Sequence, residues 1–153
     1  MGKTVATNRK ARHDYVVEDT FEAGIALTGT EIKSVRESHV NLQDAYARIE
    51  RGEAWLVGVR IAPWPGGNRY NHEPMRDRKL LLHRTQIDQL VGRTKAKGLT
   101  MVPLSMYLND RGKAKVQIGL VRGKRTYDRR RDIAARDARR DMEREISDAA
   151  RGR

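Results

Sequence analysis

Apolar and polar residues alternate along much of the chain, and this period of two predicts β-strands that bury one face. The clearest example is the pair of runs Thr100 to Leu108 and Lys113 to Val121, which the polar turn Asn109 to Gly112 separates. Ala45 to Ile49 and Ala54 to Ile61 predict a hairpin in the same way, because a glycine between them can adopt the positive φ of a tight turn.

The segment before these strands combines an extended and a helical pattern. Tyr15 to Val17 and Phe21 to Leu27 are rich in β-branched and apolar residues, and they predict a strand pair or one long bent strand. Thr28 and Glu31 have the spacing of a capping box, in which each side chain accepts a hydrogen bond from the backbone of the other residue. A short helix is therefore predicted from Gly29 to about Ser38.

The middle of the chain predicts a loop, a short strand and a second helix. Pro63 to Pro74 is too rich in proline and glycine to hold regular pairing. Lys79 to His83 is a short apolar strand, and the apolar residues from Ile87 to Val91 begin a helix that ends near Lys97. Short antiparallel strands with helices inserted between them predict a mainly β fold class, an OB-fold-like antiparallel β-barrel.

Three parts are expected along the chain. Residues 1–12 contain four basic residues and no acid, which predicts a flexible basic arm. Residues 13–123 form the barrel, and residues 124–153 are a basic C-terminal tail. The apolar stripe of this tail is small and its charged residues are frequent, so we expect it to be disordered alone and helical on a partner.

Composition narrows the range of partners. The chain has 32 Lys and Arg residues against 20 Asp and Glu residues, a formal charge of +12, which favours a polyanionic partner. It has no cysteine, which excludes disulfides and thiolate metal sites. No apolar run approaches the roughly 20 residues of a membrane span, and no apolar stretch follows the N-terminus. We therefore expect a cytoplasmic protein that does not bind membranes.

Catalytic chemistry has little support in the sequence. The four histidines never have the spacing that places two imidazoles on one metal ion, so no metal site and no cofactor are expected. His13 and Asp14 are neighbours in a predicted strand and would point to opposite faces. Glu18, Asp19 and Glu22 are interpreted as acids that orient arginines. The protein is predicted not to be an enzyme, with a metal-free nuclease that uses Glu18, Glu22 and His13 as the alternative.

Basic residues gather in two groups that point to nucleic acid. Between Arg111 and Tyr127 there is no acid, and Lys113 and Lys115 share the solvent face of their strand because the apolar residues face inward. The second group is Arg69, Arg76, Arg78 and Lys79, with Trp64 and Tyr70 available to stack on bases, and Lys33 and Arg36 lie on the outer face of the first helix. Because aromatic residues are few, a folded RNA fits better than a single strand.

Five segments follow one another in a characteristic order over nearly the whole chain. They are Asn8 to Tyr15, Phe21 to Gly24, Gly29 to Ser34, Arg78 to His83 and Gly123 to Arg130. This succession resembles the SsrA-binding protein family, SmpB. The resemblance implies a bacterial protein that binds the tRNA-like domain of tmRNA (SsrA RNA) and delivers it to stalled ribosomes for trans-translation. It also implies contact with the decoding centre and messenger channel of the small subunit, and with elongation factor Tu through aminoacylated tmRNA.

The resemblance also implies particular site residues. Asn8, His13, Glu22, Leu81 and Lys115 match positions that bind RNA in the family, although Leu81 taken alone would be assigned to the core. With the basic positions added, the expected RNA-binding set is Asn8, Arg12, His13, Glu22, Lys33, Arg36, Arg76, Arg78, Lys79, Leu81, Lys113 and Lys115. The expected ribosome-binding tail is Gly123, Lys124, Arg125, Tyr127, Asp128, Arg129 and Arg130. A ribosomal or ribosome-assembly protein with a basic extension is the alternative function.

Overall fold

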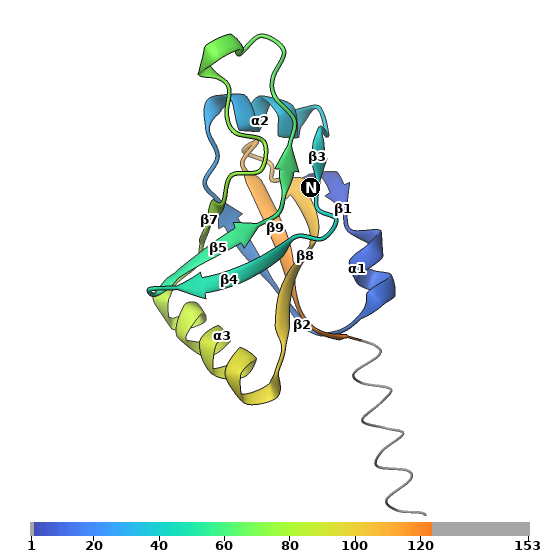
Figure 1. The fold of residues 1–153 in the computed structure, drawn as a ribbon, viewed down its shortest axis with the longest axis vertical. Helices are drawn as coiled ribbons and strands as arrows, with labels where there is room; N and C mark the ends of the chain where they lie inside the picture. The colour runs from blue at the N-terminus through green and yellow to red at the C-terminus, as the bar shows by residue number, and fades with distance from the viewer. Residues whose placement is uncertain (1, 124–153) are drawn as a thin grey trace, which may run out of the picture. The chain divides into compact units, whose positions relative to one another are not determined.

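The alternating runs of the sequence form the strands of one antiparallel sheet in the computed structural model, which describes residues 2–123 without the side chains of Asn68 and Lys97 (Figure 1). The predicted C-terminal tail lies outside the described residues. The strands of this sheet are β1 (Lys3–Thr7), β2 (Tyr15–Ile25), β4 (Tyr46–Glu50), β5 (Glu53–Val57), β7 (Arg78–Leu81), β8 (Thr100–Leu108) and β9 (Ala114–Gly123). Two short strands, β3 (Val40–Asn41) and β6 (Arg60–Ile61), pair with each other.

The sheet closes on itself. Its strand order is β1-β8-β4-β5-β7-β2-β9, and β9 also pairs with β8, so the strands from β8 to β9 form a ring. β4 pairs with β8 at Met101, whereas β1 pairs with β8 from Ser105 to Leu108. In the β4–β5 hairpin, Arg51 and Gly52 have φ values of 53° and 77°, which confirms the positive φ predicted for this turn. The mainly β, antiparallel barrel predicted from the sequence is thus confirmed.

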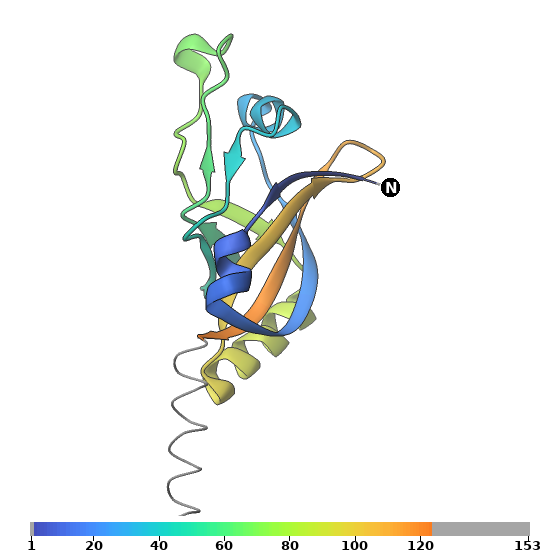
Figure 2. The same cartoon turned by 90° about the vertical axis from the view of Figure 1, so that its right-hand side faces the viewer.

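The described part of the chain also contains three α-helices. They are α1 (Arg9–Asp14), α2 (Gly29–Arg36) and α3 (Arg84–Lys97), and α2 and α3 lie toward opposite ends of the barrel (Figures 1 and 2). The main core fills the barrel interior with side chains such as Leu56, Met106 and Ile118. A smaller cluster that includes Ala11, Val102 and Leu104 lies beneath α1.

The N-terminal segment differs from the sequence prediction. Lys3–Thr7 is strand β1, in which Lys3 lies opposite Leu108 and Thr7 opposite Ser105, and Arg9–Asp14 is helix α1. This pairing corrects the flexible basic arm predicted for residues 1–12. The sequence signal was misleading because the partner strand lies near the other end of the barrel sequence. In addition, the only apolar residues buried in this segment are Val5 and Ala11, among many exposed polar residues.

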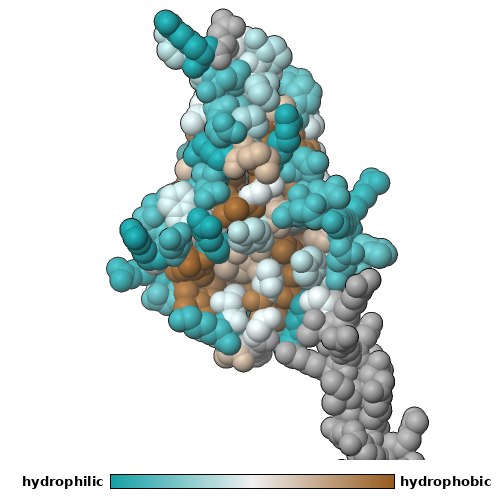
Figure 3. All heavy atoms as spheres, viewed as in Figure 1, coloured by the Kyte–Doolittle hydropathy of each residue, from teal (hydrophilic) through white to brown (hydrophobic). Residues whose placement is uncertain are grey.

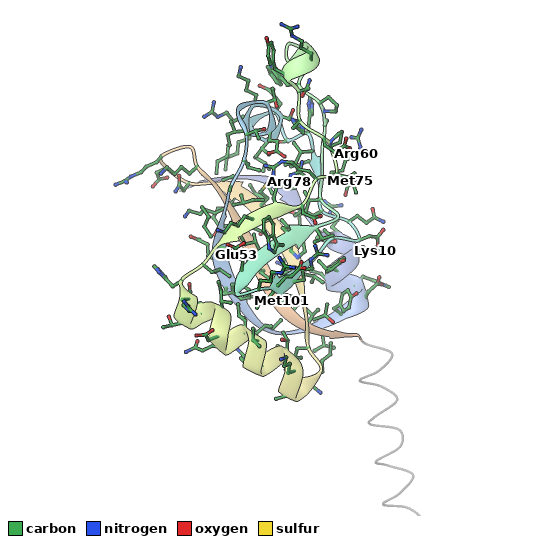
Figure 4. All side chains as sticks on the ribbon, turned by 60° about the vertical axis from the view of Figure 1, so that its left-hand side comes forward. Lys10, Glu53, Arg60, Met75, Arg78 and Met101 are labelled. Carbon is green, nitrogen blue, oxygen red and sulfur yellow. The ribbon has the colours of Figure 1, made fainter. Side chains whose placement is uncertain are left out.

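A buried ion cluster joins α2 to β7 and to the chain before β7. The predicted capping box is present, since the Glu31 carboxylate accepts from the Thr28 amide at 2.9 Å. The same fully buried carboxylate accepts from the Arg78 guanidinium at 2.6 Å and from Arg76 Nη2 at 2.5 Å. Arg78, which is also fully buried, donates its other N–H groups to the carbonyl oxygens of Val59 and Pro74, at 2.6 and 3.0 Å. Figure 4 labels Arg78 within the fold.

Electrostatics in this cluster favour the charged form of Glu31. Burial by itself would raise the pKa of Glu31, but the hydrogen bonds from Arg76, Thr28 and Arg78 outweigh burial and hold the pKa below its ordinary value of 4.5. Burial lowers the pKa of Arg78, and the contact with Glu31 opposes that effect. Since a buried arginine that loses its carboxylate partner is left uncompensated, removing either charge should be strongly destabilising.

We expect Glu31→Gln to lower the free energy of unfolding by about 3–5 kcal/mol, because it leaves the Arg78 charge buried and unpaired. Urea denaturation measures this loss. Glu50→Gln is the matched control, because it removes a carboxylate that also pairs with an arginine, Arg48 at 3.4 Å, but on the surface. Exposed ion pairs contribute little, so this substitution should leave the free energy of unfolding nearly unchanged. The difference between wild type and Glu31→Gln should be full above pH 4.5 and should shrink as the pH falls through the lowered folded pKa. Equal stability of the two variants at neutral pH would contradict the structural role of the cluster.

Candidate RNA-binding surface

Three residues that the family resemblance singles out lie on one outer surface of the barrel. Gly24 of β2 lies opposite Leu81 of β7, and a Cβ atom placed on Gly24 would be 3.2 Å from Leu81 Cβ. Glu22 precedes Gly24 by two residues and therefore shares its face. Lys115 lies on β9, the other neighbour of β2 in the sheet. We call Glu22, Leu81, Tyr107 and Lys115 the strand-face site.

Tyr107 completes this site from β8. It lies opposite Lys115 in the β8–β9 ladder, and its hydroxyl donates to Glu22 Oε2. Because β9 lies between β8 and β2, this hydrogen bond spans the strand that carries Lys115. Burial and the bond to Glu22 raise the pKa of Tyr107 to about 12. Tyr107 thus holds one carboxylate oxygen of Glu22 in place and leaves the other able to accept a further hydrogen bond.

Tyr107 is not among the site residues predicted from the sequence. Its outward direction could be predicted, since Met106 and Leu108 on either side of it face inward in the alternating pattern. Its partner could not, because Glu22 is 85 residues away in the sequence and belongs to a strand that is not its neighbour. The pairing of these two side chains is a product of barrel closure.

Leu81 is exposed on the same surface, with 55% of its area accessible, whereas the preceding Leu80 is buried. The core assignment favoured for Leu81 on composition alone is therefore wrong. Leu81 borders an open hollow of about 600 Å³ between the β4–β5 turn, β7 and the start of α3, with Arg51 and Arg84 also in its lining. An apolar side chain beside arginines offers a nucleobase both a packing surface and nearby positive charge.

The lysines of β9 and its turn face outward, as the alternation predicts. Ala114 and Val116 are buried, whereas Lys113 is exposed and Lys115 is partly exposed. Neither lysine forms an ion pair with any carboxylate among residues 2–123. Their ammonium groups therefore remain available for an anionic partner.

Several expected RNA-binding residues have structural roles in the fold. Arg78 has no exposed surface, so the expected contact with RNA is corrected to a role in the Glu31 cluster. Asn8 is buried as well, and its side-chain amide donates to the carbonyl oxygens of Leu42 and Pro103 while its oxygen caps α1. Arg76 pairs with Glu31, and Lys79 Nζ lies 3.2 Å from Glu53.

The remaining expected residues are exposed but lie on helices. Arg12 and His13 are on α1, and Lys33 and Arg36 are on α2. His13 Nδ1 is 3.0 Å from Asp14 Oδ1, which corrects the expectation that these neighbours point apart, because they belong to a helix instead of a strand. Gly123 is the last residue of β9, and the other expected tail residues, Lys124, Arg125, Tyr127, Asp128, Arg129 and Arg130, lie outside the described part of the chain.

The acids of β2 have separate basic or phenolic partners. Asp19 Oδ2 lies 2.6 Å from Arg93 Nη1, and the hydrogen bond from Arg93 lowers the pKa of Asp19. Glu18 Oε1 lies 2.6 Å from Arg122 Nε. The two groups form an ion pair, but their geometry is not that of a hydrogen bond. Glu18 and Asp19 thus lie against arginines, as interpreted from the sequence, whereas Glu22 accepts from the Tyr107 hydroxyl and does not fit that interpretation. Among residues 2–123, no group of three or more histidines and acids could hold a metal ion, and no helix is long and apolar enough to cross a membrane.

The chain is similar to the members of one known protein family. The sequence model of the family described as SmpB protein matches residues 5–148. The chain belongs to the SmpB family. Two curated relatives, both called SsrA-binding protein, support this membership: the one from Listeria welshimeri is 59% identical over 143 residues, which cover 94% of this chain and 92% of the relative. The one from Moorella thermoacetica is 56% identical over 144 residues, covering 94% and 93% of the two chains.

A solved structure of the SmpB family has a similar fold. It is described as "tmRNA-SmpB: a journey to the center of the bacterial ribosome", and it aligns with a TM-score of 0.66 and 51% sequence identity. The alignment covers 78% of this chain and 83% of that chain. The resemblance inferred from the five sequence segments is thereby confirmed.

The raised pKa of Tyr107 gives the strand-face site a spectroscopic signature. We expect one of the five tyrosines to ionise near pH 12, well above the ordinary value of 10, in an alkaline titration followed by tyrosinate absorbance. Tyr107→Phe should remove this transition, and Glu22→Gln should move it toward lower pH because the carboxylate no longer opposes ionisation. Because the folded pKa is the higher one, the contribution of Tyr107 to stability is full below pH 10 and is lost as the pH rises through about 12. A titration in which all tyrosines ionise together near pH 10 would contradict the Tyr107–Glu22 bond.

Proposed function

We propose that this protein binds the tRNA-like domain of tmRNA and delivers it to stalled ribosomes for trans-translation, the rescue of ribosomes and tagging of incomplete proteins. The observation that carries the proposal is the strand-face site, in which Glu22, Leu81 and Lys115 come together from three strands. The name of the relatives and the description of the solved structure support the same partners, tmRNA and the ribosome.

The strand-face site suits a folded RNA for three physical reasons. Lys115, with Lys113 nearby on the same face, attracts phosphates. Leu81 gives an exposed nucleobase an apolar surface. Glu22 would repel phosphate, so in a complex it must meet a donor such as a ribose 2′-hydroxyl or an exocyclic amino group. A carboxylate fixed by Tyr107 therefore selects for a particular arrangement of RNA groups, which charge alone cannot do.

The tail completes the proposal. Residues 124–153 would enter the messenger channel of the small subunit and reach the decoding centre, and elongation factor Tu would join through the aminoacylated tmRNA. Support comes from the composition of this segment, which is highly charged and weakly apolar and so favours folding on a partner. In this proposal the barrel binds tmRNA and the tail contacts the ribosome.

Lys115→Ala should weaken binding of the tRNA-like domain and reduce the slope of log affinity against log salt by about one, the value for one lost phosphate contact. Lys95→Ala, an exposed lysine on α3, is the control because it removes the same charge away from the strand-face site. Filter binding at several salt concentrations measures both quantities. Equal effects of the two substitutions would show that only net charge matters and would contradict a localised site.

Truncation after Tyr127 should leave affinity for tmRNA nearly intact and abolish rescue of ribosomes stalled on messages without a stop codon. The measurements are tmRNA binding and the release or tagging of peptide from such ribosomes in a reconstituted translation system. A parallel loss of tmRNA binding would contradict separate roles of the barrel and the tail.

Sequencing the RNA that co-purifies with the native protein distinguishes this function from that of a general ribosomal protein. A general ribosomal protein would co-purify with ribosomal RNA alone.

A further inference from the structure

The segment between β6 and β7 projects beyond α2, away from the end of the barrel that carries α3 (Figure 1). Its tip is the 3-10 turn η1 (Asn68–Tyr70), and Tyr70 is 76% exposed, the most exposed of the large apolar and aromatic residues that the structure describes. Most exposed aromatic residues need no explanation when they stand alone on a mobile loop. Tyr70 differs because the loop beneath it is tied together.

Hydrogen bonds hold the two sides of this loop against each other. The Asn71 side chain accepts from the Trp64 amide at 2.9 Å and donates to the Trp64 carbonyl oxygen at 2.6 Å. The amides of Gly67 and Tyr70 close two successive turns, each at 2.9 Å. Trp64 thus supports the loop, and the tip has a defined direction.

His72 joins the base of the loop to the rest of the fold. One ring nitrogen lies 2.8 Å from the Ile61 carbonyl oxygen on β6, and the other lies 2.9 Å from Thr30 Oγ1 on α2. The loop and α2 therefore form one continuous structure. Lys33 follows Thr30 by one helical turn, so its exposed ammonium group lies on the side of α2 near the loop.

Arg69 prepares the Tyr70 ring for a stacked partner. Its guanidinium carbon lies 4.9 Å from the ring centroid, and its Nη2 donates to the Tyr70 hydroxyl at 2.8 Å. One face of the ring is therefore covered by a cation, and the other is open to solvent. A cation on one face restrains the ring and strengthens its attraction for an electron-rich base on the other.

We propose that Arg69 and Tyr70 form a second RNA contact, in which an unpaired nucleobase stacks on the open face of Tyr70 and Lys33 meets an adjoining phosphate. This loop-tip site goes beyond the proposed function, which uses the strand-face site. A protein partner would require an apolar surround for the tyrosine. Here the projecting end is mainly hydrophilic (Figure 3), and the side chain that covers the Tyr70 ring, Arg69, is cationic. The base can come from tmRNA or from ribosomal RNA.

The test compares Tyr70→Ala with Tyr70→Phe in the full chain. Base stacking on an aromatic ring predicts that Tyr70→Ala weakens binding to one RNA source by about 5- to 150-fold, whereas Tyr70→Phe keeps most of the affinity. Isolated tmRNA and stalled ribosomes are the two arms, and the arm that responds identifies the source. Tyr46→Ala, which removes another exposed tyrosine from β4, is the matched control and should leave both arms unchanged.

Three outcomes would overturn the loop-tip site. They are unchanged binding of Tyr70→Ala in both arms, equal losses for the Ala and Phe variants, and cross-linking only to protein when a photoreactive phenylalanine derivative replaces Tyr70. Thermal unfolding of each variant shows whether the fold is kept, and Tyr70→Phe separates loss of the ring from loss of its hydroxyl. Failure of the proposed function would appear differently, as wild-type protein that does not prefer tmRNA over competitor RNA.

Discussion

The buried Glu31 carboxylate is the constraint on which both surfaces depend. Two arginines and a backbone amide converge on it, and their hydrogen bonds compensate for the large cost of removing the Glu31 and Arg78 charges from water. Arg78 is the first residue of β7, the strand that ends at the exposed Leu81. Arg76 lies at the end of the projecting loop, and Glu31 belongs to α2, the helix that carries Lys33. A single ion cluster therefore fixes the strand that contributes to the strand-face site and the base of the loop that presents Tyr70.

The count of 32 basic residues overstates the number of cations that are available to RNA. Arg76, Arg78, Arg93 and Arg122 each lie against a carboxylate, and Lys10 and Lys79 form exposed pairs. Lys113 and Lys115 have no such partner among residues 2–123. Exposed pairs hold their charges weakly and can exchange partners when phosphate approaches, whereas the Arg78 charge is committed to the fold. Where RNA would bind depends on the position of each cation and on whether it is paired with a carboxylate, more than on the number of cations.

The strand-face site combines attraction with selection. A lysine alone would attract any polyanion, but the adjacent Glu22, held by Tyr107, makes an arriving phosphate unfavourable at that point. Only an RNA that places a donor against the carboxylate and its phosphates against the lysines satisfies both.

The local features of this protein can be predicted from its sequence. They are the alternating strands, the Thr28–Glu31 capping box, the positive φ in the β4–β5 turn and the outward direction of Lys113 and Lys115. These depend on residues a few positions apart, so they are visible in the pattern. Three other features are visible only in the folded chain: Arg78 and Asn8 are buried, Lys3–Thr7 is a strand, and Tyr107 contacts Glu22. Each of these depends on partners from distant parts of the chain, because closure of the barrel sets both the neighbours of a side chain and its distance from water.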